Sequence, residues 1–445
     1  MTVEGDVDGN GEPDVTLRGG RRDTFCKGCG LWVASSGNRL HALALEGFGT
    51  GVRIGPYWDW QTGGPFPSQV TLADNVLDRL VMRKIDTFGI SIGSIFSPNC
   101  GVPQPQRCES HSSWRNTTIT GNTIETGDTG IAAKIHHVGE RVEDVKVTEN
   151  RIRIAGRDAG IIFETGNDST RARISDVLIA RNTIEGRVDI GISVAAGVQR
   201  GQANTTEGVR ILDNRVHLVS PGSGYCCAGI VVNAGSDSAE AAFPDARPLR
   251  YPDGNVVRNV EISGNSVSGT LDTGVSVMAG VGAGGSQNRV ENVRIERSTI
   301  RSSRVASGVR LMMGAGQPFM NRYATGNRIA GVTISVNRIT VGKNPGETND
   351  PLTGGVVLVA GGRFGRRGVI RDVRITNNRI ATARAGIRLV GGMESTSRGN
   401  SVACVRLAGN RITGTRNAVV VTPNVPGPKP SVRGASGNRA SLGGC

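Results

Sequence analysis

The feature that most constrains this chain is a short repeat, a glycine followed by apolar residues at alternate positions. The copies begin at Gly51 (GVRI), Gly89 (GISI), Gly130 (GIAA), Gly160 (GIIF), Gly191 (GISV), Gly229 (GIVV), Gly274 (GVSV), Gly308 (GVRL), Gly355 (GVVL) and Gly386 (GIRL), with a degenerate AVVV at Ala418. Apolar residues at every second position are typical of a strand with one buried face. The repeat therefore predicts about eleven copies of one structural unit.

A second motif lies between successive copies, where a short alternating strand ends in Asn-x-Ile or Asn-x-Val. Its residues are Asn122, Asn150, Asn182, Asn214, Asn265, Asn337, Asn378 and Asn410, and we expect Arg83 and Ser298 to hold the same place in two other copies. An amide side chain both donates and accepts hydrogen bonds, so Asn residues can bond up and down a column. The motif predicts copies that are stacked in register.

The strands recur without an amphipathic helix between them, and their spacing of 30 to 47 residues has too few strand signals for a four-stranded propeller blade. Strands of this kind can each bury one face by stacking on their own copies, about 4.8 Å apart. We therefore predict an all-β fold, a parallel β-helix solenoid of about eleven coils.

The segments VEDVKVTENRI followed by DAGIIF, and IRDVRITNNRI followed by RAGIRL, resemble the right-handed parallel β-helix family, the pectate-lyase-like superfamily. The resemblance covers about residues 30–422 and implies a single-stranded, right-handed helix. It says little about function, because members include polysaccharide lyases, glycoside hydrolases, epimerases, phage tailspikes and non-catalytic surface proteins. The chain has neither the polygalacturonase signatures (Asn-Thr-Asp, Asp-Asp and Gly-His-Gly) nor the Asp-Pro-His-Glu of alginate epimerases.

Three regions are expected: a lead-in or cap over residues 1–29, the β-helix over 30–422, and a tail over 423–445 that packs on the last coil. The polar, acidic N-terminus has no basic start and apolar core of a secretory signal, and no clear cap precedes Gly30. We therefore expect the chain to be a piece of a longer precursor.

The eight cysteines occur as the near pairs Cys26/Cys29, Cys100/Cys108 and Cys226/Cys227, with Cys404 and Cys445 near the end. We predict disulfides rather than zinc, because the Cys-x-x-Cys unit at residue 26 has no second half. Disulfides form in oxidising compartments, so they predict an extracytoplasmic or secreted location.

The formal net charge of +14 agrees with a polyanionic partner. Only six of the basic residues are Lys, and an Arg excess along the chain is more typical of composition bias than of a nucleic-acid footprint. We therefore expect no nucleic-acid partner. No stretch approaches the roughly 18 consecutive apolar residues of a membrane-spanning helix, so we expect no membrane insertion.

Charged residues recur on the face that strand alternation directs to solvent. The candidate catalytic residues are Asp128, Asp158 and Asp189, two residues before Gly in three successive copies, together with Lys134 and Glu164, four residues after Gly, and His136. Carboxylates one coil apart raise each other's pKa unless a cation lies between them. The row therefore predicts a cation-binding or acid/base strip. The alternatives are turn-forming Asp residues and a surface salt bridge between Lys134 and Glu164.

Histidine is scarce, and His136 and His137 follow a strand end where neighbouring side chains point to opposite faces. At most one of them is expected to reach a cleft.

Ten of the seventeen aromatic residues precede residue 117. The candidate substrate-binding residues are Tyr57, Trp58, Asp59 and Trp60 in one loop, and Trp114 after the next long loop. Flat rings bind sugars by stacking, so these loops are expected to form the wall of a carbohydrate cleft. The alternative is a hydrophobic cap over the N-terminal coils.

The segment DVDGNGEPD has the spacing of a calcium loop, with oxygen ligands expected from Asp6, Asp8, Asn10 and Asp14. The twelfth position is Leu17 instead of Glu, so a helix-flanked calcium hand is not expected. A shorter Ca2+ loop and a plain turn-rich segment both stay open.

These features predict an exported carbohydrate-active β-helix protein that acts on an acidic polysaccharide by lyase or glycoside hydrolase chemistry. In an elimination, Lys134 or His136 is the expected base, and the three Asp residues hold Ca2+ against the uronate carboxylate. The alternative hypothesis is a non-enzymatic, surface-exposed or adhesive β-helix whose Asp row serves only the turns.

Overall fold

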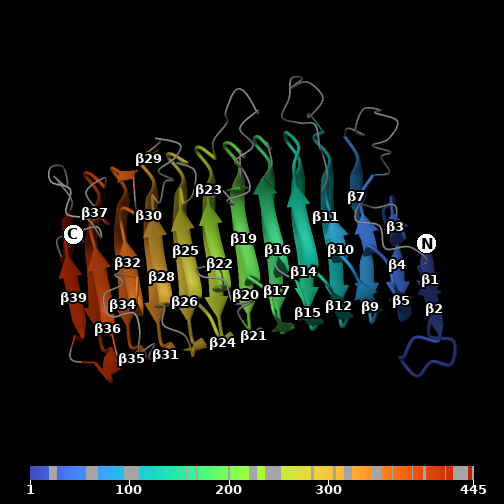
Figure 1. Cartoon of the computed structure of the whole chain (residues 1–445). Coiled ribbons are helices and arrows are strands. Elements are labelled where there is room, and N and C mark those ends of the chain that lie inside the picture. Colours follow the sequence, from blue (N-terminus) through green and yellow to red (C-terminus); the bar gives the residue numbers. More distant parts are fainter. Residues whose placement is uncertain are drawn as a thin grey trace.

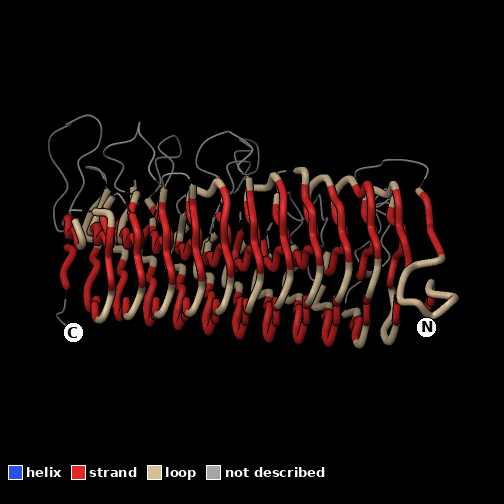
Figure 2. Tube along the Cα trace, turned by 90° about the horizontal axis from the view of Figure 1, so that it is seen from below, coloured by secondary structure: helices blue, strands red, loops and turns tan. Residues whose placement is uncertain are grey.

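The structure is a computed structural model of the chain. It describes residues 1–19, 28–56, 69–94, 110–156, 158–166, 169–198, 201–219, 228–235, 252–281, 285–303, 307–314, 323–342, 352–362, 364–382, 384–393, 397–415, 417–423 and 439–442. Three long parallel sheets, A, B and C, run from one end of the molecule to the other, and the chain termini lie at opposite ends (Figures 1 and 2).

Sheet A holds the first strand of each coil. In spatial order these are β1 (Thr2–Glu4), β4 (Arg39–His41), β8 (Val76–Asp78), β11 (Ser113–Thr120), β14 (Arg141–Thr148), β17 (Arg173–Ala180), β20 (Thr205–Leu212), β23 (Val256–Ser263), β26 (Arg289–Glu296), β30 (Arg328–Ser335), β34 (Val369–Thr376), β37 (Ser401–Ala408) and β40 (Arg439–Leu442), with β7 (Thr71–Ala73) also paired to β11.

Sheet B holds short strands, which are β2 (Val15–Arg18), β5 (Leu43–Glu46), β9 (Val81–Ile85), β12 (Thr123–Thr126), β15 (Arg151–Ile154), β18 (Thr183–Gly186), β21 (Arg215–Leu218), β24 (Ser266–Gly269), β27 (Thr299–Ser302), β31 (Arg338–Val341), β35 (Arg379–Thr382) and β38 (Arg411–Thr413).

Sheet C holds the Gly-headed strands, which are β3 (Cys29–Val33), β6 (Thr50–Ile54), β10 (Phe88–Ile92), β13 (Thr129–Ile135), β16 (Ala159–Gly166), β19 (Ile190–Val198), β22 (Ala228–Ala234), β25 (Thr273–Ala279), β28 (Ser307–Met313), β32 (Gly354–Val359), β36 (Ala385–Val390) and β39 (Val419–Thr422). A small separate sheet pairs β29 (Ala324–Thr325) with β33 (Gly365–Arg366).

Each coil contributes one strand to sheets A, B and C in turn, and every strand pairs in parallel with the equivalent strand of the next coil. This is the topology of a right-handed, single-stranded parallel β-helix, and it confirms the predicted fold. Sheet C contains one more copy of the repeat than expected: Gly30 in β3 begins it, and Leu31 pairs with Val52 of β6.

The repeat glycines are needed where each coil turns from sheet B into sheet C. A Cβ on Gly130 would lie 2.5 Å from Cγ2 of Ile152 and 2.4 Å from the carbonyl oxygen of Gly160, both in the next coil. The inward residue that follows each glycine is fully buried, as at Ile131, Ile161 and Ile192. Tight stacking of apolar columns therefore leaves no room for a side chain at the turn.

The predicted Asn column exists between sheets A and B. Asn182 Oδ1 accepts hydrogen bonds from the backbone N–H of Asn150 at 3.0 Å and from its side-chain amide at 2.9 Å. Ser298 takes the expected place in the column, because the N–H of Asn265 donates to its Oγ at 3.2 Å. The expectation for Arg83 is wrong, since the N–H of Leu80 makes the corresponding bond to Asn122 Oδ1.

A second Asn column, which the sequence analysis missed, precedes the strands of sheet A. Its described members are Asn38, Asn75, Asn204, Asn255, Asn288, Asn327 and Asn400. Its members follow connections of very different length, so no fixed spacing reveals them. Glu140 holds the equivalent place in the coil of β14, since Arg173 bonds to its carbonyl group as Arg141 does to that of Ser112.

The ends of the chain differ from the middle. Strands β1 and β2 pair with β4 and β5, so sheets A and B begin inside the predicted lead-in, 1–29. In the predicted tail, β40 pairs with β37, while 424–438 and 443–445 lie outside the described residues. Only Cys29 and Cys404 among the cysteines are described, so the disulfides stay a prediction. In the described parts of the chain, no helix is long and apolar enough to cross a membrane.

Candidate functional site

The outer face of sheet C differs from an ordinary solvent-facing sheet surface. Strands of sheet B alternate between exposed and buried residues, whereas β6, β10, β13 and β16 are buried at almost every position. Outward residues such as Ala132 and Ser193 are at most 5% exposed. A charged side chain on this face therefore needs a partner, because burial of an unpaired charge is costly.

Lys134 is such a charge, and it lies between two carboxylates. It points outward from β13, because its neighbours Ala133 and Ile135 belong to the core. Its Nζ lies 3.0 Å from Oδ2 of Asp158 and 3.6 Å from Oε1 of Glu164. The side chains of Lys134 and Glu164 are each 15% exposed and that of Asp158 is 36% exposed, so solvent still reaches the group.

Strand register explains why these three residues meet. Lys134 in β13 and Glu164 in β16 are register partners in adjacent coils. Asp158 immediately precedes β16, and its Oδ2 also accepts a hydrogen bond from Thr129 Oγ1 at 2.9 Å. The Phe88 ring of the preceding coil lies 5.9 Å from the ammonium group. We call Lys134, Asp158 and Glu164 the sheet C triad.

Burial and neighbouring charges shift the pKa values of Lys134 and Glu164. Burial raises the pKa of Glu164 against the opposing charge of Lys134. Burial disfavours the Lys134 ammonium, but Glu164 and Asp158 outweigh this and raise the pKa of Lys134. Lys134 is therefore a fixed cation, and Glu164 is the carboxyl group that most readily retains a proton.

The other two Asp residues of the predicted row lie in the same column as Asp158. The N–H of Ile190 bonds to the carbonyl group of Asp158, which places Asp189 one coil further along. Asp128 lies one coil earlier, is half-buried, and adds to the rise in the pKa of Lys134. The predicted row of carboxylates therefore exists, and the ammonium group of Lys134 lies against its middle member, Asp158.

The structure corrects the expectation that His136 is an accessible base. His136 and His137 are 4% and 1% exposed, so both rings are buried despite their opposite directions. Burial, with the charges of Lys134 and His137, lowers the pKa of His136 to about 3. A neutral ring so far from solvent is a poor proton acceptor for a polymer at the surface.

A buried polar network beside the triad was not expected from the sequence. Glu140 is fully buried, and its carboxylate accepts hydrogen bonds from Ser94 Oγ and from the N–H of His137, while His137 Nδ1 lies 3.1 Å from Oε1. The Ser94 hydroxyl oxygen also accepts a bond from the N–H of His136. This network fixes the backbone that follows β13. Its sequence signal is a Glu at a place where several other coils have Asn.

The structure also corrects the assignment of Trp114 to substrate binding. Trp114 is fully buried and lies in register with Leu72 and Val142 of the neighbouring coils. Its ring is part of the core and has no face to offer a sugar. Tyr57, Trp58, Asp59 and Trp60 lie outside the described residues, so the aromatic wall stays a prediction.

The predicted calcium loop brings three carboxylates together near the N-terminus. Ligand atoms of Asp6, Asp8 and Asp14 lie within 4.8 Å of one another. The amide of Asn10 donates to Asp8 in this cluster, and its Oδ1 accepts a hydrogen bond from the N–H of Glu12. Backbone N–H groups of Val7 and Asp8 already bond to Asp14 Oδ2. Ca2+ binding here stays a prediction.

Comparisons with known proteins find only distant similarities to solved structures. No protein-family model matches the chain, and no curated protein matches it significantly. Similar solved structures include the A-module of the Azotobacter vinelandii mannuronan C-5 epimerase AlgE6, with 14% identity over 93% of this chain and 91% of that one and a TM-score of 0.34. A Yersinia enterocolitica family 28 exopolygalacturonase has 12% identity over 93% and 79%, with a TM-score of 0.32. A tailspike mutant of E. coli bacteriophage HK620, in complex with a pentasaccharide, has 12% identity over 86% and 60%, with a TM-score of 0.30. These values say nothing about the site.

Proposed function

We propose that this chain is an exported carbohydrate-active protein that hydrolyses an acidic polysaccharide at the sheet C triad. The observation that carries the proposal is the pair of carboxylates that share one buried ammonium group on a face where the surrounding residues are small or apolar. Glycoside hydrolysis commonly uses two carboxyl groups, one of which must hold a proton.

Glu164 is the proposed general acid, because burial raises its pKa and favours its protonated form. Asp158 is the proposed second carboxylate, held by Lys134 and by Thr129. Oxygens of the two carboxylates lie 3.0 and 3.6 Å from the same nitrogen atom, so both carboxyl groups face one small region of the surface.

Lys134 is proposed to hold the Asp158 side chain in position through their ion pair and to attract an anionic sugar. The raised pKa of Lys134 argues against its use as the base of an elimination, because a protonated amine cannot accept a proton. Hydrolysis is therefore a better fit to the triad than lyase chemistry.

The test is an assay on pectate, alginate, chondroitin and heparin-like polymers that measures new reducing ends and the ultraviolet absorbance of unsaturated uronates. We expect reducing ends without the absorbance rise. Glu164→Gln is expected to lower kcat by about 10²- to 10⁴-fold with an unchanged melting temperature. Glu185→Gln, on the outer face of sheet B, is the matched control and is expected to keep full activity.

Other outcomes contradict the proposal in distinct ways. An absorbance rise establishes elimination. Polymer binding without any product favours the adhesive, non-enzymatic alternative. Hydrolysis that survives Glu164→Gln removes the triad from the mechanism.

A further inference from the structure

The positive charge of the chain is concentrated in its C-terminal coils. Residues 287–445 contain 25 Lys and Arg against 6 Asp and Glu, a net charge of +19. Residues 1–286 contain 27 against 32, a net charge of −5. The Arg excess is therefore not spread evenly, which removes the reason to attribute it to composition bias alone.

On the N-terminal coils, the outer face of sheet B separates its cations from one another. Arg153 in β15 lies in register between Glu125 of β12 and Glu185 of β18. Arg151 lies between two threonines in the same way. Neighbouring charges on this part of the face are opposite or absent, as expected for a solvated sheet surface.

In the C-terminal coils, by contrast, arginines of successive strands lie directly opposite one another. Arg338 of β31, Arg379 of β35 and Arg411 of β38 are register partners on three successive coils, and all three are exposed. We call them the arginine ladder. No ion pair to these three arginines is found among the described residues, and no acidic residue lines the hollow beside them.

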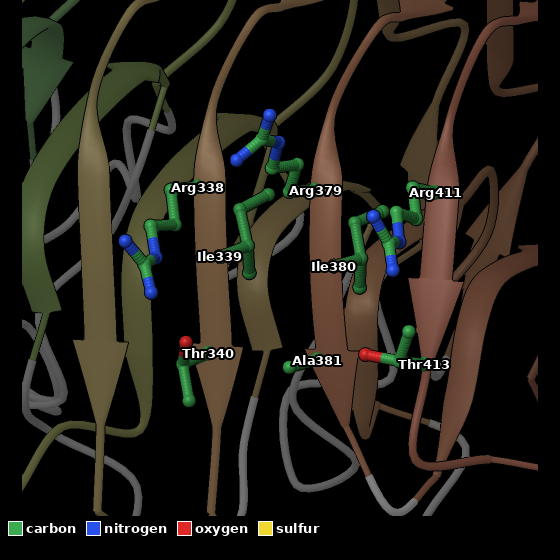
Figure 3. Close-up of a pocket in the computed structure, with 8 residues that line it drawn as sticks. All are labelled: Arg338, Ile339, Thr340, Arg379, Ile380, Ala381, Arg411 and Thr413. Atoms are coloured by element: carbon green, nitrogen blue, oxygen red, sulfur yellow. The ribbon is translucent and has the colours of Figure 1, made fainter.

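A shallow cavity of about 260 Å³ runs along the ladder (Figure 3). Two residues further along each strand, Thr340, Ala381 and Thr413 present small side chains, which leave this space open beside the guanidinium groups. Arg301 of β27, in the preceding coil, is in register with Thr340 and adds a further cation beside this face. The result is a positive trough across three successive coils.

Like charges directly opposite each other destabilise a sheet. We propose that the arginine ladder binds a linear polyanion, an extended carboxylated or sulfated polysaccharide that lies across the coils along the solenoid axis. Strand spacing places successive arginines about 4.8 Å apart, and each guanidinium fork can bind a carboxylate or sulfate group with two hydrogen bonds. An anionic polymer removes the repulsion that the free protein carries.

The surface favours a polysaccharide over a nucleic acid. The residues that line the trough include no aromatic side chain, so unpaired bases have no ring to stack on. The face is a flat sheet without the protruding helix or ribbon that enters a DNA major groove. The ladder is on a different sheet from the triad and on coils near the C-terminus (Figure 1). The inference rests on the proposed function only for the class of polymer.

The test compares two triple variants that remove the same charge from the same sheet face. One is Arg338→Gln/Arg379→Gln/Arg411→Gln, and the matched control is Arg151→Gln/Arg153→Gln/Arg215→Gln. Affinity for heparin and for polygalacturonate is measured at several salt concentrations, and melting temperatures confirm that both variants fold. The ladder variant is expected to bind on the order of tenfold or more weakly and to reduce the slope of log affinity against log salt by about three. The control variant is expected to bind nearly as wild type.

Several results would overturn the inference. Equal losses of affinity in the two variants mean that polymer binding depends on net charge alone and not on the position of the arginines. Tighter binding to duplex DNA than to either polysaccharide identifies a nucleic-acid partner. Salt-sensitive self-association that the ladder variant abolishes identifies a second copy of this chain as the occupant. Glu164→Gln separates the two proposals: if it leaves hydrolysis intact while the ladder still binds polymer, only the proposed function fails.

Discussion

Arg153 on sheet B and Lys134 on sheet C are both cations beside acidic residues of neighbouring coils, yet their surroundings differ. Arg153 is exposed between Glu125 and Glu185. Lys134 is 15% exposed and contacts the carboxylates of Asp158 and Glu164 directly. Water screens the first group, so its charges interact weakly. The second group loses that screening, and its charges must be paired and shift one another's pKa.

The largest expected difference between the two faces is in stability. Lys134→Met leaves Asp158 and Glu164 facing each other without a cation, and we expect a loss of about 3 kcal/mol at neutral pH. Arg153→Met on sheet B is expected to cost less than about 1 kcal/mol. Urea denaturation of both variants measures this difference. Equal losses would show that burial does not distinguish the two faces.

A second difference concerns acid stability. The pKa of His136 falls from 6.5 to about 3 on folding, so the unfolded chain binds a proton that the folded chain refuses between these values. Stability is therefore expected to fall as the pH drops from about 6.5 to about 3, by an amount on the order of a few kcal/mol. His136→Gln is expected to flatten this part of the stability profile.

The control for this prediction is His217→Gln on sheet B, where the ring bonds to Ser268 at the surface. Thermal denaturation at a series of pH values compares the two variants. A wild-type pH dependence in His136→Gln contradicts the burial of this ring.

The proposed activity supplies a third contrast. Because burial raises the pKa of Glu164, the basic limb of kcat/KM is expected above the ordinary range of a carboxyl group, with about a tenfold loss for each pH unit beyond it. A pH profile of reducing-end formation measures the limb. Glu185→Gln on sheet B is expected to leave it in place. A limb within the ordinary carboxyl range rules out Glu164 as the acid.

The smallest expected effect concerns Asp128, which lies one coil before Asp158 and outside the sheet C triad. Asp128 adds to the rise in the pKa of Lys134, and its contribution ranks below those of Glu164 and Asp158. Asp128→Asn is therefore expected to change stability by less than about 1 kcal/mol and to change kcat less than Asp158→Asn does. Parallel assays of the two variants test the order. A larger effect from Asp128→Asn moves the centre of the site by one coil.

The periodic parts of this molecule could be predicted from residues such as Gly130 and Asn182. A glycine that admits no Cβ and an amide that bonds to the next coil each recur once per coil, so their spacing reports the fold directly. The copy at Gly30 and the Asn column of sheet A escaped notice, because the first lies outside the region where the repeat is clear and the second follows loops of unequal length. The assignment of Trp114 was wrong because Asn116, with a φ of 48°, breaks the alternation within β11, so that Trp114 points inward together with Thr117 and Ile119.

The sequence by itself determined the stacked parallel coils, the column of carboxylates and the meeting of Lys134 with Glu164, because strand period and coil register are properties of local spacing. Only the tertiary structure decided which outward residues are shielded from water. That shielding buries His136, raises the pKa of Glu164 and leaves the arginine ladder exposed. Burial depends on the packing of segments distant in sequence, and it decides how strongly each charged group interacts with its neighbours.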